Sequence, residues 1–470
     1  MRTEYLKDCR GLTVSTSNAS ALAAYERAAD LTHGYYVDPL AEIDIALEHD
    51  PHFAMAHCLR AAIAVMSSEQ GALPMLAESV AAVELLGARA DERERAHAAA
   101  ARAWLERDFE RAGRLYGDIV LAHPHDLVAL QTAHLIDFYL GESTLLRDRV
   151  AQVINEWSAD VPGYGYLLGM YAFGLEETAL YERAEDTGRR ALELNPRDPW
   201  AVHAVAHVME MQGRTAEGIE WLNRTAPDWA DDCAFAYHNW WHLALYHLEL
   251  GDTARALELY DGAIHPRSTQ VPLELVDAVA LLWRLRLRGV ALGDRWRDVA
   301  QSWAQTPEGG FYAFNDVHAL MAYAATGRHE DVARVLASLE NHATEADTNA
   351  RISRDVGLPL ARGIAALVDG RASESVEHIL PMRTRAHRFG GSHAQRDLVH
   401  LTLVEAAFAA GDFARARALV SERTESKPSS PFNWQLAVRA HEALADQQRA
   451  EACRMRAQQA VASQSVRRVA

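Results

Sequence analysis

Two pairs of histidines are the residues of this sequence best suited to chemistry: His203 and His207 in HAVAHVME, and His238 and His242 in HNWWHLALYHLE. Histidine titrates near neutral pH and is a common ligand for transition metals. Within each pair the residues are four positions apart, and residues at this spacing share one face of a helix. The pairs are 35 residues apart, close to the roughly 34 residues of one hairpin in a helical-repeat protein. Neighbouring hairpins are therefore expected to carry one pair each.

Three interpretations of the histidine pairs are open. In the first, His203, His207, His238 and His242 bind a divalent metal, and imidazole with a nearby carboxylate from Glu210 suits zinc or iron. The spacing is not the HExxH of metalloproteases. In the second, the histidines form a metal-free polar site, where histidine and glutamate do acid–base work on a small molecule between aromatic walls. In the third, they are satisfied groups at helix contacts and do no chemistry.

The elements that must position these residues are helices arranged in repeats. Apolar residues recur at spacings of three and four almost throughout, and alternating strand patterns are nearly absent. Residues 165–198 carry small or aromatic residues at tetratricopeptide positions, among them Ala172, Tyr181, Ala184 and Pro196. The sequence therefore predicts an all-α solenoid of roughly a dozen tetratricopeptide-like helix pairs, curled around a central cavity. We assign residues 20–460 to this solenoid, residues 1–19 to an N-terminal extension and residues 461–470 to a C-terminal tail.

Repeat register predicts which side chains face the concave surface. In such arrays the first helix of each hairpin lines that surface, and counting along the first helices places all four histidines there. Measured from the glycines between helices, however, the two pairs are offset by about one turn, so a single four-histidine cluster does not follow from register alone. The same reasoning predicts catalytic support from Glu176 and Glu210, and substrate binding by a further set of residues. These are His318, Asp316, Arg396, His393, Trp241 and Tyr166.

Neighbouring Glu176 and Glu177 both point inward in this register. Two adjacent buried anions repel each other, so one of them is expected to pair with Arg396 or a histidine, or to be protonated. Arg396 is also the predicted anchor for an anionic group of a substrate, because a guanidinium binds a carboxylate or phosphate through two hydrogen bonds.

Composition limits the partners and the compartment. The 470 residues carry a formal net charge of -18. We therefore expect that neither nucleic acid nor an anionic membrane is a partner, since binding phosphates requires a basic surface. The four cysteines are scattered without paired spacing, as in reduced cytoplasmic proteins. No uninterrupted apolar run reaches the roughly 18 residues of a membrane span. A small molecule or peptide remains as the partner, and oligomeric state is left open.

Several sequence blocks together resemble the tetratricopeptide repeat protein 38 family. They include ERERAHAAAARAWLERDFERA, HAVAHVMEMQGR, HNWWHLALYHLELGD, FNDVHALMAYAATGR and GGSHAQRDLVH, and they follow the same order over nearly the whole chain. The family tends to carry an acidic residue directly after the histidine of the His134 block, whereas Leu135 stands here. The resemblance implies an all-helical solenoid, and it implies no particular reaction, substrate or cofactor.

The sequence thus predicts a cytoplasmic helical-repeat protein with a concave site lined by His, Glu and Trp. Our leading hypothesis is a small-molecule enzyme or binder that uses histidine acid–base chemistry or a bound metal, zinc or iron. The alternative is a protein-interaction scaffold that holds an extended peptide or a chain terminus in its groove. A scaffold is expected to have an open groove, and an enzyme a closed interior with pockets.

Overall fold

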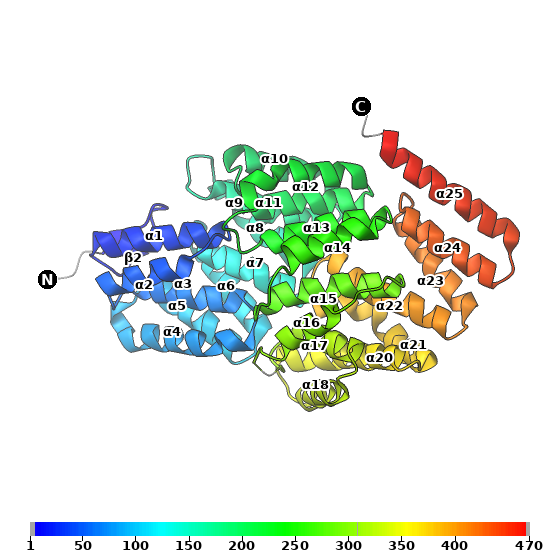
Figure 1. The fold of residues 1–470 in the computed structure, drawn as a ribbon. Helices are drawn as coiled ribbons and strands as arrows, with labels where there is room; N and C mark the ends of the chain where they lie inside the picture. The colour runs from blue at the N-terminus through cyan, green and yellow to red at the C-terminus, as the bar shows by residue number, and fades with distance from the viewer. Residues whose placement is uncertain (1–4, 308, 467–470) are drawn as a thin grey trace.

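The computed structural model describes residues 5–307 and 309–466 of the chain. In Figure 1 the last four helices, α22 to α25, follow one another at the right-hand end of the molecule. The described residues begin with a short antiparallel hairpin of β1 (Leu6–Lys7) and β2 (Thr13–Val14), in which Leu6 pairs with Val14. Everything that follows is helical or a short turn. The all-α solenoid predicted from the sequence is confirmed.

The helices of the first half have these bounds: α1 Ala19–His33, α2 Pro39–His49, α3 Ala54–Met66, α4 Leu73–Leu86, α5 Glu92–Leu105, α6 Phe109–Ala122, α7 Leu127–Leu140, α8 Ser143–Val153, α9 Tyr164–Glu177, α10 Tyr181–Leu194, α11 Pro199–Met211 and α12 Thr215–Trp229. Those of the second half are α13 Ala236–Glu249, α14 Thr253–Leu259, α15 Pro272–Leu287, α16 Arg295–Trp303, α17 Ala313–Ala325, α18 His329–His342, α19 Thr348–Ile352, α20 Leu358–Val368, α21 Ala372–Ile379, α22 His393–Ala409, α23 Phe413–Ser426, α24 Pro431–Ala443 and α25 Gln447–Val466. Short 3-10 or π segments adjoin them at Gln70–Ala72, Gly87–Arg89, Ile154–Glu156, Tyr260–Ile264, Ser353–Gly357 and Leu380–Phe389.

Local sequence signals start and stop the helices that matter for the site. Asp198 caps α11, because its carboxylate accepts from the backbone N–H groups of Trp200 and Ala201. Gly213 and Gly251 follow α11 and α13 with positive φ angles of 66° and 81°, a conformation that glycine adopts without strain. These turns reverse the chain and send the next helix back along its neighbour.

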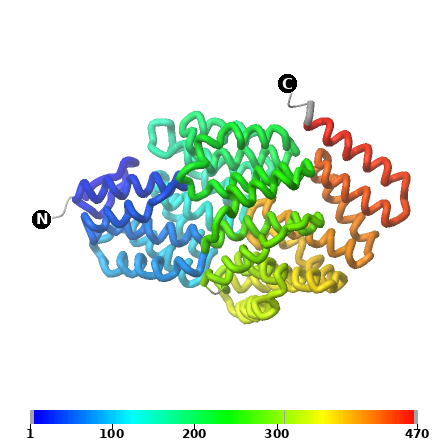
Figure 2. Tube along the Cα trace, in the orientation of Figure 1, coloured from blue at the N-terminus to red at the C-terminus, as the bar shows by residue number. Residues whose placement is uncertain are grey.

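Successive hairpins stack into a superhelix that bends back on itself. Figures 1 and 2 show the chain passing from α1–α6 through the α9–α13 layer, down to α15–α21, and back through α22–α25. Hydrogen bonds and ion pairs join residues far apart in sequence across the concave side. Asn315 Nδ2 donates to the Ser68 carbonyl at 3.1 Å, and Tyr312 Oη donates to the Tyr139 carbonyl at 2.9 Å. Arg396 pairs with Glu177 at 3.0 Å, and Gln464 Nε2 donates to the Gly213 carbonyl at 2.6 Å. The expected curling around the interior is therefore present.

One stretch, Gln70–Arg89, is apolar enough and long enough to cross a membrane by length and composition alone. Core helices of soluble proteins meet the same criterion. Here α4, which makes up most of the stretch, packs against α3 and α5.

Candidate functional site

The four histidines predicted as the centre of the site lie together inside the solenoid. α11 carries His203 and His207, and α13 carries His238 and His242. All four rings are buried, with exposed fractions of 6% or less. One ring nitrogen from each lies within 4.8 Å of the corresponding atoms of the other three.

The one-turn offset between the pairs does not separate them, because the rings interleave. The Nε2 atom of His238 lies 3.1 Å from Nε2 of His203 and 3.3 Å from Nε2 of His242. The ring centroids of His207 and His242 are 4.4 Å apart. The offset seen in the register therefore lets the rings of α13 alternate in height with those of α11, and the four-histidine cluster forms.

Two carboxylates behind the cluster determine which nitrogen faces inward. Asp277 on α15 lies 2.6 Å from Nδ1 of His238, and Glu210 lies 3.1 Å from Nδ1 of His242. With Nδ1 donating its proton to the carboxylate, the neutral form of either ring presents a lone pair on Nε2. These two lone pairs are the ones that face each other at 3.3 Å.

Burial disfavours the charged form of His203, His207 and His242. Desolvation, together with the other histidines, holds the pKa values of His203 and His207 well below the ordinary value. The pKa of His242 is also lowered by burial, although Glu210 opposes this. Despite its own burial, Glu210 has its pKa lowered to about 2 by nearby Lys427 and His242. At neutral pH the site therefore combines neutral imidazoles with at least one ionised carboxylate.

Two of the nitrogen–nitrogen distances within the cluster match those around a tetrahedral metal ion. Zinc–nitrogen bonds of about 2.0–2.1 Å at the tetrahedral angle place two ligand nitrogens about 3.3–3.4 Å apart. The two Nε2–Nε2 distances of 3.1 and 3.3 Å fall close to this value. A histidine whose second nitrogen is bound to a carboxylate is also the usual arrangement around protein metals.

The adjacent carboxyls Glu176 and Glu177 have divided as charge repulsion predicts. Glu177 forms an ion pair with Arg396 at 3.0 Å and accepts the backbone N–H of His393 at 2.8 Å. Glu176 is fully buried, and burial with the neighbouring anions raises its pKa well above the ordinary value. One of its oxygens lies 3.5 Å from Nδ1 of His207, so a protonated Glu176 borders the cluster.

An apolar pocket opens beside His203 and His238. Its volume is about 320 Å³, at the lower end of the range of small-molecule sites. Its lining comes from the turn after α1, the start of α13, the start of α15 and the first turn of α22, together with residues of α11. The lining residues include Tyr35, Trp200, Phe235, Tyr237, Leu273, Asp277 and Gln395. The stacked rings of Tyr35 and Trp200, 5.6 Å apart, form part of one wall.

The predicted substrate-binding residues are dispersed, and the structure places them as follows. Trp241 stacks on His238 with ring centroids 5.4 Å apart, and His393 and Arg396 both contact Glu177. His318 Nδ1 lies 2.8 Å from the Phe314 carbonyl. The last two line other pockets: Asp316 accepts the Gly310 N–H at 2.9 Å, and the Tyr166 hydroxyl lies 3.3 Å from the Asp30 carboxylate. Among the described residues, the group of four potential metal ligands does not include His318.

Asp277 is the site residue that sequence reasoning missed. It stands in the apolar run LVDAVALLW of α15, and it is only 1% exposed. A lone acid within such a run is a signal of a buried polar contact, because an unpaired charge there would be costly. Its partner could not be identified from the sequence, since α15 belongs to a different repeat from His238.

No family model matches the chain. Solved structures to which it is similar include the human IFIT1 dimer with PPP-AAAA, at 11% identity and a TM-score of 0.38, covering 93% of this chain and 88% of that one. Yeast Tom70 has 12% identity and a TM-score of 0.32, with coverages of 95% and 96%. The P58(IPK) TPR domain has 14% identity and a TM-score of 0.21, with coverages of 84% and 99%.

These likenesses are between helical-repeat proteins and carry no argument about activity. They also lend no support to the expected exclusion of nucleic acid, which remains a prediction from net charge alone. What the chain itself shows is a tetratricopeptide-like α-solenoid with a buried four-histidine cluster beside an apolar pocket.

Proposed function

We propose that this chain is a helical-repeat protein that binds a divalent transition metal through His203, His207, His238 and His242, and a small molecule in the adjacent pocket. The observation that carries the proposal is the pair of Nε2 lone pairs held 3.3 Å apart by Asp277 and Glu210. Lone pairs at that distance repel each other unless a proton or a metal ion lies between them. A metal ion would satisfy both at once.

Zinc and iron are the metals that fit best. Neutral imidazole nitrogens suit both, and the site offers no thiolate that would favour a softer ion. The carboxylates of Asp277 and Glu210 would fix the ring orientations and raise the basicity of the ligands. A metal at this position could polarise a carbonyl group or activate water, and an enzymatic role rests on that chemistry.

The pocket favours a compact, largely apolar ligand over an extended peptide. His203 and His238 form its polar end, while rings such as those of Tyr35 and Phe235 form its walls. An extended peptide would need a continuous open groove, whereas the contacts between distant repeats cross the concave side of this solenoid. The scaffold hypothesis therefore serves as the alternative outcome of the test below.

We further propose membership of the tetratricopeptide repeat protein 38 family and a cytoplasmic location. The family resemblance supports the first, because two of its blocks carry all four cluster histidines. The unpaired state of Cys9, Cys58, Cys233 and Cys453 supports the second.

Elemental analysis of the purified full-length protein tests the metal site. We expect close to one equivalent of zinc or iron, as isolated or after anaerobic reconstitution, and loss of that metal in the double variant His203→Ala/His242→Ala. The control is His49→Ala/His52→Ala, which removes two exposed histidines. Circular dichroism of each variant verifies that the fold is retained.

Two results would overturn the proposal. One is a folded wild-type protein that stays free of metal after reconstitution, which would favour the metal-free polar site. The other is equal metal content in the wild type and the cluster variant. A third result would decide the role of the pocket. If the protein keeps its metal and binds extended peptides, and blocking the pocket abolishes that peptide binding, the scaffold hypothesis is favoured over a small-molecule role.

A further inference from the structure

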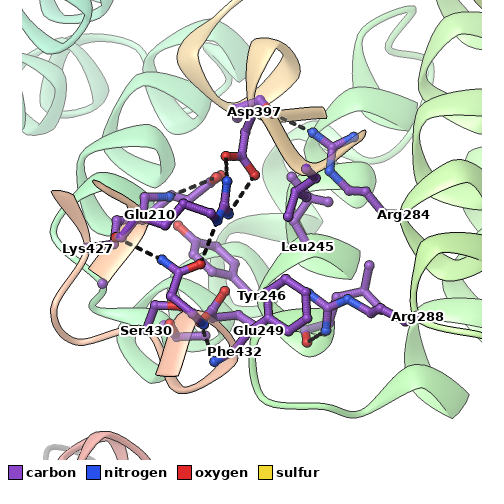
Figure 3. A pocket seen from close by; sticks show the side chains of 17 residues that line it. Glu210, Leu245, Tyr246, Glu249, Arg284, Arg288, Asp397, Lys427, Ser430 and Phe432 are labelled. Atoms are coloured by element: carbon purple, nitrogen blue, oxygen red, sulfur yellow. Dashed lines mark hydrogen bonds and ion pairs between the residues drawn. The ribbon is translucent and has the colours of Figure 1, made fainter. Parts of the chain in front are cut away.

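A second cavity is lined in part by Glu210, whose carboxylate also lies 3.1 Å from His242 of the cluster. Figure 3 shows Arg284 and Arg288 on one side of this cavity and Glu210 and Lys427 on the other. Its volume is about 60 Å³, whereas a water molecule needs roughly 10–15 Å³ in the same measure. The space therefore suits several waters or one compact chemical group.

Two of the four cations around this cavity are compensated by carboxylates. Arg423 forms an ion pair with Asp397 at 2.5 Å and donates to the Asn433 side chain at 2.9 Å. Lys427 lies 3.6 Å from Glu210. In each of these pairs the carboxylate balances the charge of the cation.

The other two cations, Arg284 and Arg288, share one remaining carboxylate, Glu249, so the residues lining the cavity carry one more positive than negative charge. Among the described residues, neither guanidinium forms an ion pair with a carboxylate. Arg284 is 4% exposed and donates to the carbonyls of Ala280 and Ala394, at 3.1 and 2.6 Å. Arg288 donates to the Leu248 carbonyl. A guanidinium has five N–H donors, so each side chain keeps donors beyond those recorded bonds.

Aromatic faces hold both guanidiniums in place beside the cavity. Arg288 lies over the ring of Phe432 at 3.6 Å, and Arg284 lies over Trp241 at 5.3 Å. Desolvation lowers the pKa of Arg288 to about 10, and it also lowers that of Arg284. Both remain cationic at neutral pH, where Asp397 acts most strongly on Arg284 and Glu249 on Arg288, although neither carboxylate forms an ion pair with them.

We propose that this cavity binds a compact anionic group, a carboxylate or a phosphate of a small molecule, between Arg284 and Arg288. The planar guanidinium matches both groups, since it donates two parallel hydrogen bonds to their oxygens. Glu210, Glu249 and Asp397 also line the cavity, and these carboxylates repel a larger polyanion. Arg396, the anchor predicted from the sequence, is already paired with Glu177.

This inference does not depend on the metal or on the ligand of the apolar pocket. The histidine cluster can fail its test while the anion site passes, and the reverse also holds. Glu210 belongs to both sites, since it accepts from His242 and lies near Lys427. It is left unchanged in the experiment for that reason.

Isothermal titration calorimetry of the full-length protein tests the site with two probes, inorganic phosphate and acetate, at an ionic strength held constant with sodium chloride. We expect saturable binding of at least one probe. The variants Arg288→Met and Arg284→Met keep the apolar stem of each side chain, and each is expected to raise Kd by about tenfold or more, since a hydrogen bond to a charged group contributes roughly 1.5–3 kcal/mol. The control is Arg286→Met, which removes an exposed arginine from the same helix.

The two probes distinguish the source of the anion. Tighter binding of phosphate indicates a phosphorylated ligand, and tighter binding of acetate indicates a carboxylate. The proposal is overturned if neither anion gives saturable heat, or if Arg288→Met binds as the wild type does. Because Arg288 is only partly buried, that variant decides the matter even if Arg284→Met fails to fold.

Discussion

Replacement of Asp277 by alanine separates a metal centre from a merely polar cluster. Asp277 touches no proposed metal position itself; it lies 2.6 Å from Nδ1 of His238 and orients that ring. Loss of such a carboxylate behind a histidine ligand typically weakens metal affinity by about 10–100-fold, or about 1.4–2.7 kcal/mol. We therefore expect this loss in Asp277→Ala, and a smaller one in Asp277→Asn, whose amide oxygen still accepts a hydrogen bond.

Competition against a fluorescent zinc chelator measures the affinity directly. Thermal or urea unfolding at fixed free zinc gives a second readout, because a ligand stabilises the native state in proportion to the logarithm of its concentration over Kd. When zinc is well above both dissociation constants, the metal-dependent stabilisation is expected to fall by the same 1.4–2.7 kcal/mol. The control is Glu274→Gln, which removes a charge from the same helix and pocket.

The reasoning is refuted if Asp277→Ala binds zinc as tightly as the wild type and Glu274→Gln do. It is equally refuted if the variant loses stability without zinc and shows no further loss with it. In that case Asp277 would serve only to satisfy a buried histidine, and the lone-pair argument would not describe the site.

Three further predictions concern stability. Burial raises the pKa of Asp198 to about 7, above its unfolded value, so its ionisation destabilises the fold as pH rises from about 4 through 7. Asp198→Asn keeps the helix cap and should be more stable than wild type at pH 8, by about 4 kcal/mol. In urea unfolding the difference should vanish near pH 4. Gly174→Ala should lower the free energy of unfolding by about 1–3 kcal/mol, because a Cβ there would lie 2.5 Å from the backbone nitrogen of Arg147. The control is Gly262→Ala, whose Cβ would meet no atom within 4 Å. Equal melting temperatures of the two variants would contradict this reasoning. Glu176→Gln should unfold at pH 7 with nearly wild-type stability if the acid is neutral there, and a loss of about 3–5 kcal/mol would instead reveal a buried ion pair with His207.

Periodicity and residue type were enough to predict the solenoid and to select its central residues. The 3.6-residue pattern determines which face of each helix is apolar, and the glycines at the turns determine where hairpins reverse. His203, His207, His238 and His242 could be found because spacing within a helix converts directly into a shared face. Repulsion between Glu176 and Glu177 predicted correctly that the two carboxyls would differ in environment.

Only the tertiary structure decided how separate repeats meet. Small rotations and rises between hairpins add up along the chain, and no local pattern records them, so the interleaving of the histidine rings and the partnership of Asp277 with His238 emerged only in three dimensions. The same return of the chain paired Arg396 with Glu177 and left Arg284 and Arg288 at a cavity without carboxylate partners among the described residues. A side chain's type and face follow from its own helix, whereas its partner lies on another helix, 39 residues away for His238 and Asp277 and 219 residues away for Glu177 and Arg396.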